Sequence, residues 1–147
     1  MTSVDEFASA LADEHGLAVV STADSRGRVL SSVVNAGVMP HPVSGDAHVA
    51  FVSGGTATRL GHIRRGAPVT LVARRGWRWV GATGPAELIG PDDPSEGFDA
   101  DRIRLLLRAV FEAAGGSHDD WDEYDRVMRK ERRTVVLVRP ERVLGNG

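Results

Sequence analysis

Apolar residues recur along the chain with two different periods, and this difference separates helices from strands. In residues 4–15, Val4, Phe7 and Leu11 share one face at helical spacing, which predicts an amphipathic helix that ends before Gly16. Short apolar runs follow, each bounded by glycine, proline or polar turn residues. These runs predict strands at 17–22, 29–34, 47–53, 69–73, 77–89, 134–138 and 142–144.

Three further helices are predicted between these strands. One covers residues 56–65 and starts at Thr56, a good N-cap residue. A longer one opens at Asp101, and a short one opens at Asp119. This order predicts a mainly β, α+β fold in which six to seven antiparallel strands form a small barrel with marginal helices. With 147 residues, the chain 1–147 is predicted to be one domain.

Composition excludes several classes of protein. The chain has no cysteine, so a disulfide framework, a thiolate metal site and a cysteine nucleophile are ruled out. A net charge of −2 gives no overall attraction to nucleic acid, and no nucleic-acid partner is expected. Because no signal-peptide pattern or membrane-length apolar run is present, we expect a cytoplasmic protein with no membrane partner. No metal-ligand spacing and no Ser-His-Asp arrangement is evident, so neither a metal nor a catalytic residue is assigned.

Residues 54–65 are the most informative segment, because two glycines, hydroxyl side chains and an arginine lie between a strand and a helix. The N–H groups of a first helical turn have no partner within the helix, and an anion satisfies them. Arg59 falls in that turn, and its forked guanidinium suits a phosphate. The segment is typical of a phosphate site, and equally of a capped helix with a surface arginine.

Other short motifs accompany this segment in a defined order, namely 27–28, 32–35, 76–79, 84–88, 118–124 and 132–133. In order and spacing the motifs resemble the split β-barrel flavin and deazaflavin reductases, a family related to pyridoxamine 5′-phosphate oxidase. The match is strongest to the actinobacterial branch that uses coenzyme F420, and it covers nearly the whole chain. The resemblance implies an FMN-binding-like split barrel and a homodimer with the cofactor at the subunit interface.

The resemblance also implies roles for individual residues. Arg59 stands where the family usually has a phosphate-binding lysine, and Thr58 would assist it. Contacts to the ring or ribityl chain are implied for Ser32, Val33 and Asn35. Val52 and Ser53 would line the pocket. Trp77 and Trp79 would reach it from one or both subunits. Arg65 and Arg78 would receive an acidic cofactor tail.

Each of these residues also has a purely structural interpretation. Ser32 and Asn35 are compatible with the polar positions of an alternating strand. Trp77 and Trp79 share a strand face by their spacing of two, which suits core or dimer-interface anchors. Arg65 is typical of a solvated helix end, where cations are favoured.

The leading functional hypothesis is a coenzyme F420-dependent oxidoreductase that transfers a hydride from the reduced deazaflavin to an unsaturated or conjugated small molecule. One alternative is an oxidoreductase of the same fold that carries FMN. Another is a non-catalytic flavin- or haem-binding protein, in which His48 or His62 would be the axial ligand. The source of a proton stays open between solvent, His41 and Tyr124.

Overall fold

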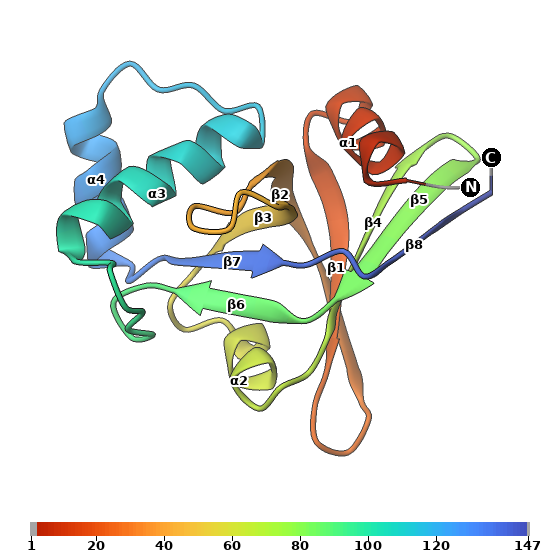
Figure 1. The fold of residues 1–147 in the computed structure, drawn as a ribbon, viewed down its shortest axis with the longest axis horizontal. Coiled ribbons are helices and arrows are strands. Elements are labelled where there is room, and N and C mark those ends of the chain that lie inside the picture. The colour runs from red at the N-terminus through yellow and green to blue at the C-terminus, as the bar shows by residue number, and fades with distance from the viewer. Residues whose placement is uncertain (1–2, 147) are drawn as a thin grey trace.

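The strands of this protein form one antiparallel sheet that curls on itself, with four helices around it (Figure 1). The computed structural model describes residues 3–146. Its strands are β1 (Leu17–Ala23), β2 (Val29–Pro40), β3 (Ala47–Ser53), β4 (Val69–Arg75), β5 (Arg78–Gly84), β6 (Ala86–Ile89), β7 (Thr134–Val138) and β8 (Arg142–Gly145). Its helices are α1 (Val4–Asp13), α2 (Thr58–Arg64), α3 (Ala100–Ala113) and α4 (Trp121–Lys130). The strand order is β6-β7-β3-β2-β1-β4-β5-β8.

Strand β2 connects the two halves of the sheet. Its first part pairs with β1, from Val29 opposite Ala23 to Asn35 opposite Leu17. Its second part pairs with β3 instead, starting with Ala36 opposite Phe51. One long strand therefore belongs to both halves, and this is the mainly β, split-barrel architecture that the sequence predicts.

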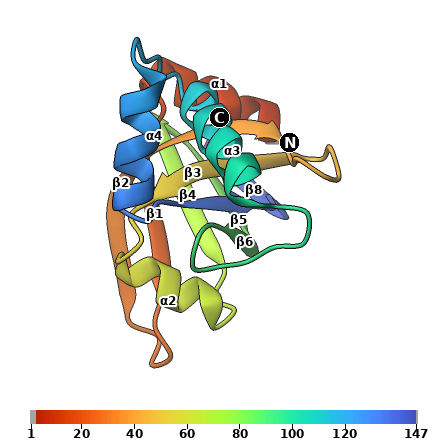
Figure 2. The same cartoon turned by 90° about the vertical axis from the view of Figure 1, so that its left-hand side faces the viewer.

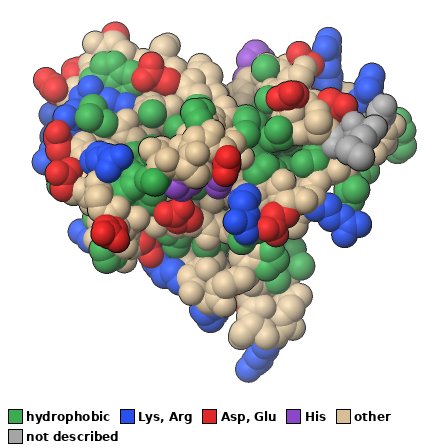
Figure 3. Space-filling view, viewed as in Figure 1, with side chains coloured by type: hydrophobic (Ala, Val, Ile, Leu, Met, Phe, Trp, Pro, Cys, Tyr) green, Lys and Arg blue, Asp and Glu red, His purple; other side chains and the backbone are tan. Residues whose placement is uncertain are grey.

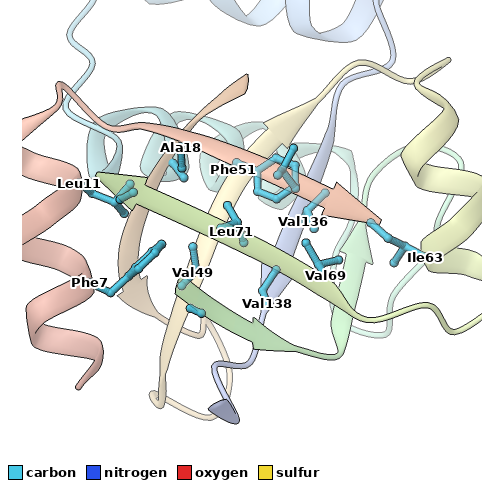
Figure 4. Close-up of a cluster of buried hydrophobic side chains, with 14 of the residues drawn as sticks. Phe7, Leu11, Ala18, Val49, Phe51, Ile63, Val69, Leu71, Val136 and Val138 are labelled. Carbon is cyan, nitrogen blue, oxygen red and sulfur yellow. The ribbon is translucent and has the colours of Figure 1, made fainter. Parts of the chain in front are cut away.

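Two apolar cores lie on opposite faces of β7, whose five residues are all buried. Val136 and Val138 point into the barrel interior and pack with Phe51 and Leu71, as Figure 4 shows. Val135 and Leu137 face the other way, into a second core beneath α3 and α4. Because both faces are covered, β7 is continuously apolar instead of alternating.

The helices cover different parts of the barrel (Figure 2). Phe7 and Leu11 of α1 enter the barrel core, while α3 packs over β2, β3 and β7. The end of α3 comes so close to Gly37 of β2 that a Cβ there would lie 2.2 Å from the carbonyl oxygen of Ala113. The longest helix in the described residues, α3, has 14 residues, and none of these helices is long and apolar enough to cross a membrane.

Two strands differ from the sequence prediction. The expected strand 77–89 breaks at Pro85 into β5 and β6, which makes eight strands in residues 3–146 instead of six to seven. At the break, Gly84 passes the backbone of Arg139 at close range. Strand β2 continues to Pro40, beyond the predicted end at residue 34. Proline is tolerated there because residues 36–40 have a ladder partner on one side only, like an edge strand.

Candidate functional site

Arg59 joins α2 to the two neighbouring strands through hydrogen bonds to hydroxyl groups. Its Nη2 donates to Oγ of Ser32 on β2 at 2.6 Å, and its Nη1 donates to Oγ of Ser53 on β3 at 2.9 Å. The Ser53 hydroxyl donates in turn to the carbonyl oxygen of Gly54 at 3.3 Å. Arg59, Ser32 and Ser53 are all predicted cofactor residues, and the structure brings them together.

The charge of Arg59 is not balanced by an acidic side chain among residues 3–146. Burial lowers the pKa of the Arg59 guanidinium, and the nearby cation Arg133 lowers it further. Hydroxyl groups satisfy the N–H donors of Arg59 but do not neutralise its charge. A partly buried cation next to a second cation is unfavourable unless an anion lies between them. The cluster is therefore suited to an anionic ligand such as a phosphate.

A cavity of about 450 Å³ lies next to Arg59, a volume in the usual range of small-molecule sites. Val33 and Asn35 of β2, Val52 of β3 and Arg59 form its strand side. Its helical side comes from α3, α4 and the residues after α3, namely Val110, Phe111, Ala114, Tyr124 and Met128. The cavity combines apolar walls, which suit a flat ring, with the unpaired cation at one side.

Asn35 also has a structural role at this cavity. With its amide oriented so that the nitrogen donates, it bonds the carbonyl oxygens of Ala114 at 3.0 Å and Gly16 at 3.2 Å. These bonds hold the end of α3 against β2, so Asn35 shapes the cavity as well as lining it.

The two side chains considered as proton donors do not fit that role well. Tyr124 lines the cavity, but its hydroxyl donates to the carbonyl oxygen of Leu107 at 3.1 Å. Burial raises the pKa of Tyr124 to about 12, with the Asp125 carboxylate adding to the shift. His41 lies outside the cavity lining, with its Nε2 2.8 Å from Oε1 of Glu87. Neither group is placed to deliver a proton to a ligand in this cavity, and a solvent proton stays the open alternative.

The start of α2 corrects the sequence prediction for Thr56. The helix begins at Thr58, and its N-cap is Ala57, which makes no side-chain capping bond. Ala57 donates its N–H to the carbonyl oxygen of Gly54 at 3.1 Å, so residues 54–57 form a turn and delay the helix by two residues. Thr56 is exposed and caps nothing. The anion-binding character of this segment therefore depends on the Arg59 side chain.

Five predicted residues lie away from the cavity within one chain. Thr58 and Arg65 are exposed at the two ends of α2. Trp77 is 91% exposed in the turn before β5. Arg78 and Trp79 line a different cavity, of about 360 Å³, between β5 and α1. If Trp77, Arg78 and Trp79 contribute to the cofactor site, they must do so from a second subunit.

Sequence reasoning did not name most of the helical wall. The lining residues that it did not name as cofactor contacts are Val34, Gly54, Val110, Phe111, Ala114, Tyr124, Met128 and Arg133, although Gly54 belongs to the predicted phosphate segment and Tyr124 was a candidate proton donor. Val110 and Phe111 belong to the apolar face of a predicted helix, but helical spacing alone does not say whether a face meets a core or a cavity. For Arg133 the available signal was a pair of arginines immediately before an apolar strand.

Solved structures share the fold of this chain. No known protein-family model matches the chain. A pyridoxamine 5′-phosphate oxidase-related, FMN-binding protein from Nostoc punctiforme PCC 73102 is 15% identical with a TM-score of 0.63, over 96% of this chain and 81% of that one. A heme-binding protein from Mycobacterium smegmatis is 17% identical with a TM-score of 0.62, over 100% of this chain and 55% of that one. The protein Atu2129 of unknown function from Agrobacterium tumefaciens str. C58 is 16% identical (TM-score 0.60), and this chain spans 60% of its length.

These neighbours establish the fold, and the residues of this chain must indicate the ligand. Neither histidine considered as a haem ligand lines the Arg59 cavity. His62 is buried with its Nδ1 2.9 Å from the Thr22 hydroxyl, and His48 has its Nδ1 2.9 Å from the carbonyl oxygen of Asp46. Residues 3–146 also contain no group of three or more His, Cys, Asp or Glu that could hold a metal ion.

Proposed function

We propose that the Arg59 cavity binds a phosphate-bearing flavin-type cofactor, that this cofactor is coenzyme F420, and that the protein reduces an unsaturated or conjugated small molecule. The observation that carries the proposal is the Arg59 guanidinium, which is partly buried, lacks an acidic partner among the described residues and lines a cavity with apolar side chains on both its strand side and its helical side. A phosphate would balance the charge of Arg59, whereas the neighbouring Arg133 is already paired with Glu131, and a planar ring would fill the space beside Val33, Val52 and Phe111.

When bound, the cofactor supplies the carbon that carries the hydride, and the protein supplies orientation and a dry environment. Arg59 would hold the phosphate with its forked guanidinium, fixed in direction by Ser32 and Ser53. Val33 and Val52 would support the ring from the sheet. Val110 and Phe111 would keep water from the opposite side.

The choice of F420 over FMN depends on cations beyond the phosphate site. Arg65 lies at the end of α2, is exposed and forms no ion pair with a described residue. Arg78 has the same character at the start of β5. An acidic tail beyond the phosphate would pair with such arginines, whereas FMN ends at its phosphate and would leave them without a ligand. FMN remains the second candidate because a protein of the same fold binds it.

Direct titration of the purified protein with each cofactor tests this proposal. We expect F420 to bind at least tenfold more tightly than FMN, which corresponds to about 1.4 kcal/mol. Trp121 reports the binding by fluorescence, because its ring packs against Phe111 and Tyr124, both of which line the cavity. A Trp121→Phe variant separates this signal from that of Trp77 and Trp79.

Tighter binding of FMN than of F420 would identify FMN as the cofactor. If neither cofactor bound at concentrations near 100 μM, a level at which a complex of about −5.5 kcal/mol is half formed, the flavin-type assignment would be withdrawn. If the protein bound F420 but no conjugated acceptor oxidised the bound reduced cofactor, we would conclude that the protein carries the cofactor and is not an enzyme.

We further propose that the protein is a homodimer. Five residues stand opposite one another across β2, β1, β4, β5 and β8 on the outer face of the sheet, and we name them the apolar row: Val33, Val19, Val72, Gly81 and Leu144. Three of its side chains are large, apolar and 43–62% exposed. Exposed large apolar side chains that share one face of a sheet are typical of a subunit interface.

A two-fold axis perpendicular to the apolar row would lay the Val33 end of one copy over the Leu144 end of the other. Val33 lines the Arg59 cavity, and Trp79 lies on the same outer face, opposite Arg74. Such an arrangement would carry the start of the partner strand β5 toward the first copy's cavity, with the partner subunit's Trp79 on the outer face and the partner subunit's Arg78 on the other face of that strand. It gives these predicted residues a route to the cofactor that one chain lacks.

Replacing Val19 with glutamate should break this dimer, because two copies of the charge would be buried at its centre. We expect the wild-type protein to sediment as a dimer at micromolar concentration and the variant as a monomer with an unchanged circular dichroism spectrum. Val43→Glu is the matched control, since Val43 is 70% exposed in the turn between β2 and β3, away from the row. A monomeric wild type, or equal dissociation by both variants, would refute the dimer.

A further inference from the structure

A cavity of about 360 Å³, separate from the one between β5 and α1, lies between α3, α4 and the loop that joins β6 to α3, and we name it the second cavity. Phe98, Ile103, Leu107 and Met128 give it a mainly apolar lining. Figure 3 shows hydrophobic atoms next to Lys and Arg atoms on the part of the surface over α3 and α4. Apolar walls with a few polar groups are typical of small-molecule sites.

Two ion pairs hold the loop over this cavity. Arg64 of α2 donates from Nε to Oδ1 of Asp93 at 2.9 Å and from Nη2 to Oδ2 at 2.7 Å. Arg132, which follows α4, donates from Nε and Nη2 to the two carboxylate oxygens of Asp92. The loop is thus tied to the two elements on either side of it, and it forms a wall of defined shape.

The charged groups at this second cavity leave one cation without a partner. Asp125 is bonded by Arg108 and also by Arg104, and these guanidinium groups hold the pKa of that carboxyl below its usual range. Its charge is therefore already matched. Arg129 lines the same cavity, and within residues 3–146 it forms no ion pair. An apolar lining with a free guanidinium at its rim is complementary to an apolar molecule that ends in a carboxylate.

We propose that this second cavity binds an apolar carboxylic acid, with its chain among Phe98, Ile103 and Leu107 and its carboxylate on Arg129. At roughly 30 Å³ for each group the size of a water molecule, the cavity holds about 12 non-hydrogen atoms, which is the size of decanoate. Met128 and Arg133 line both cavities, so the acid would lie next to the Arg59 cavity. The proposal does not rest on the cofactor assignment and is tested without any cofactor.

Decanoate is the probe, and isothermal titration calorimetry of the cofactor-free protein gives its affinity. We expect saturable binding that weakens about tenfold in Arg129→Gln, since one charge-assisted contact is lost. Lys130→Gln is the matched control, because Lys130 is also in the last turn of α4 but does not line the cavity. Ala100→Phe should abolish binding by filling the space, and Ala100 is an exposed first residue of α3 whose replacement spares the core.

A shift of the ¹³C-methyl signal of Met128 shows that the ligand lies in one of the two cavities that Met128 lines, and the Arg129 and Ala100 variants, whose positions line the second cavity alone, decide between the two. Decanoate should shift this signal and leave that of Met39, which does not line the cavity, unchanged. Decanol and acetate should both bind much more weakly than decanoate, because each lacks either the charge or the chain. Equal affinity for decanol, equal loss in the two α4 variants, no movement of the Met128 signal, or no saturable binding would each overturn the proposal.

Discussion

Replacing Arg59 with alanine should weaken cofactor binding by about 30- to 700-fold while leaving the empty protein at least as stable as the wild type. The loss of affinity follows from removing two charge-assisted hydrogen bonds to a phosphate, on the order of 2–4 kcal/mol. The opposite sign for stability follows from the free protein, in which Arg59 is partly buried next to Arg133 and has no acidic partner among the described residues. Its removal relieves an unfavourable charge.

Calorimetric titration with the preferred cofactor and urea unfolding of the cofactor-free protein together check this result. Arg26→Ala serves as control, because Arg26 is an exposed arginine in the turn between β1 and β2 and does not line the cavity. Arg59→Lys should recover part of the affinity, since a lysine keeps the charge but loses the fork. An Arg59→Ala protein with wild-type affinity would remove Arg59 from the site. One that unfolded more easily would mean that Arg59 is a structural residue.

Replacing Gly37 with alanine should destabilise the protein by about 3 kcal/mol and disturb the Arg59 cavity at the same time. The new Cβ would lie 2.2 Å from the carbonyl oxygen of Ala113, a backbone atom that cannot move unless α3 moves. Because α3 supplies Val110 and Phe111 to the cavity wall, its displacement should also lower cofactor affinity. Urea unfolding and cofactor titration of the same variant measure the two effects.

Gly61→Ala is the matched substitution with the opposite expectation. Gly61 lies within α2, and a Cβ there would approach only Nη1 of Arg65, at an ordinary contact distance of 3.7 Å. Alanine is favoured over glycine in a helix by up to about 1 kcal/mol, so this variant should be more stable than the wild type. If both variants changed stability in the same direction, the close contact at Gly37 would not explain its effect.

The fold was largely predictable because local patterns and packing agree in most elements. The two apolar faces of β7 and the helical spacing of α3 both point to the elements that the structure contains. The errors occur where tertiary contacts override local preference. Pro40 fits into β2 only because that part of the strand has one ladder partner. The predicted strand 77–89 divides at Pro85, next to the point where Gly84 passes the backbone of Arg139.

The candidate site was predictable where its residues are close in the fold and chemically distinctive. The structure brings together Arg59, Ser32 and Ser53, each named from the sequence for a separate cofactor contact, since a strand-turn-helix segment and the adjacent strand place them side by side. The sequence named Tyr124 as a candidate proton donor, but it could not show that Tyr124 and Arg133 line the cavity, because their positions depend on how α4 packs over the sheet. Trp79 stays a prediction, because its part in the site depends on a second subunit.

The ion pairs of Arg64 with Asp93 and Arg132 with Asp92 make one wall of the protein sensitive to the solution around it. Charges on a protein surface are screened within about 10 Å at 0.1 M salt, while contacts between apolar side chains are not weakened in this way. Ionic strength therefore acts on the loop over the second cavity and hardly at all on the barrel beneath it. At high salt the second cavity should therefore lose its shape before the barrel core does.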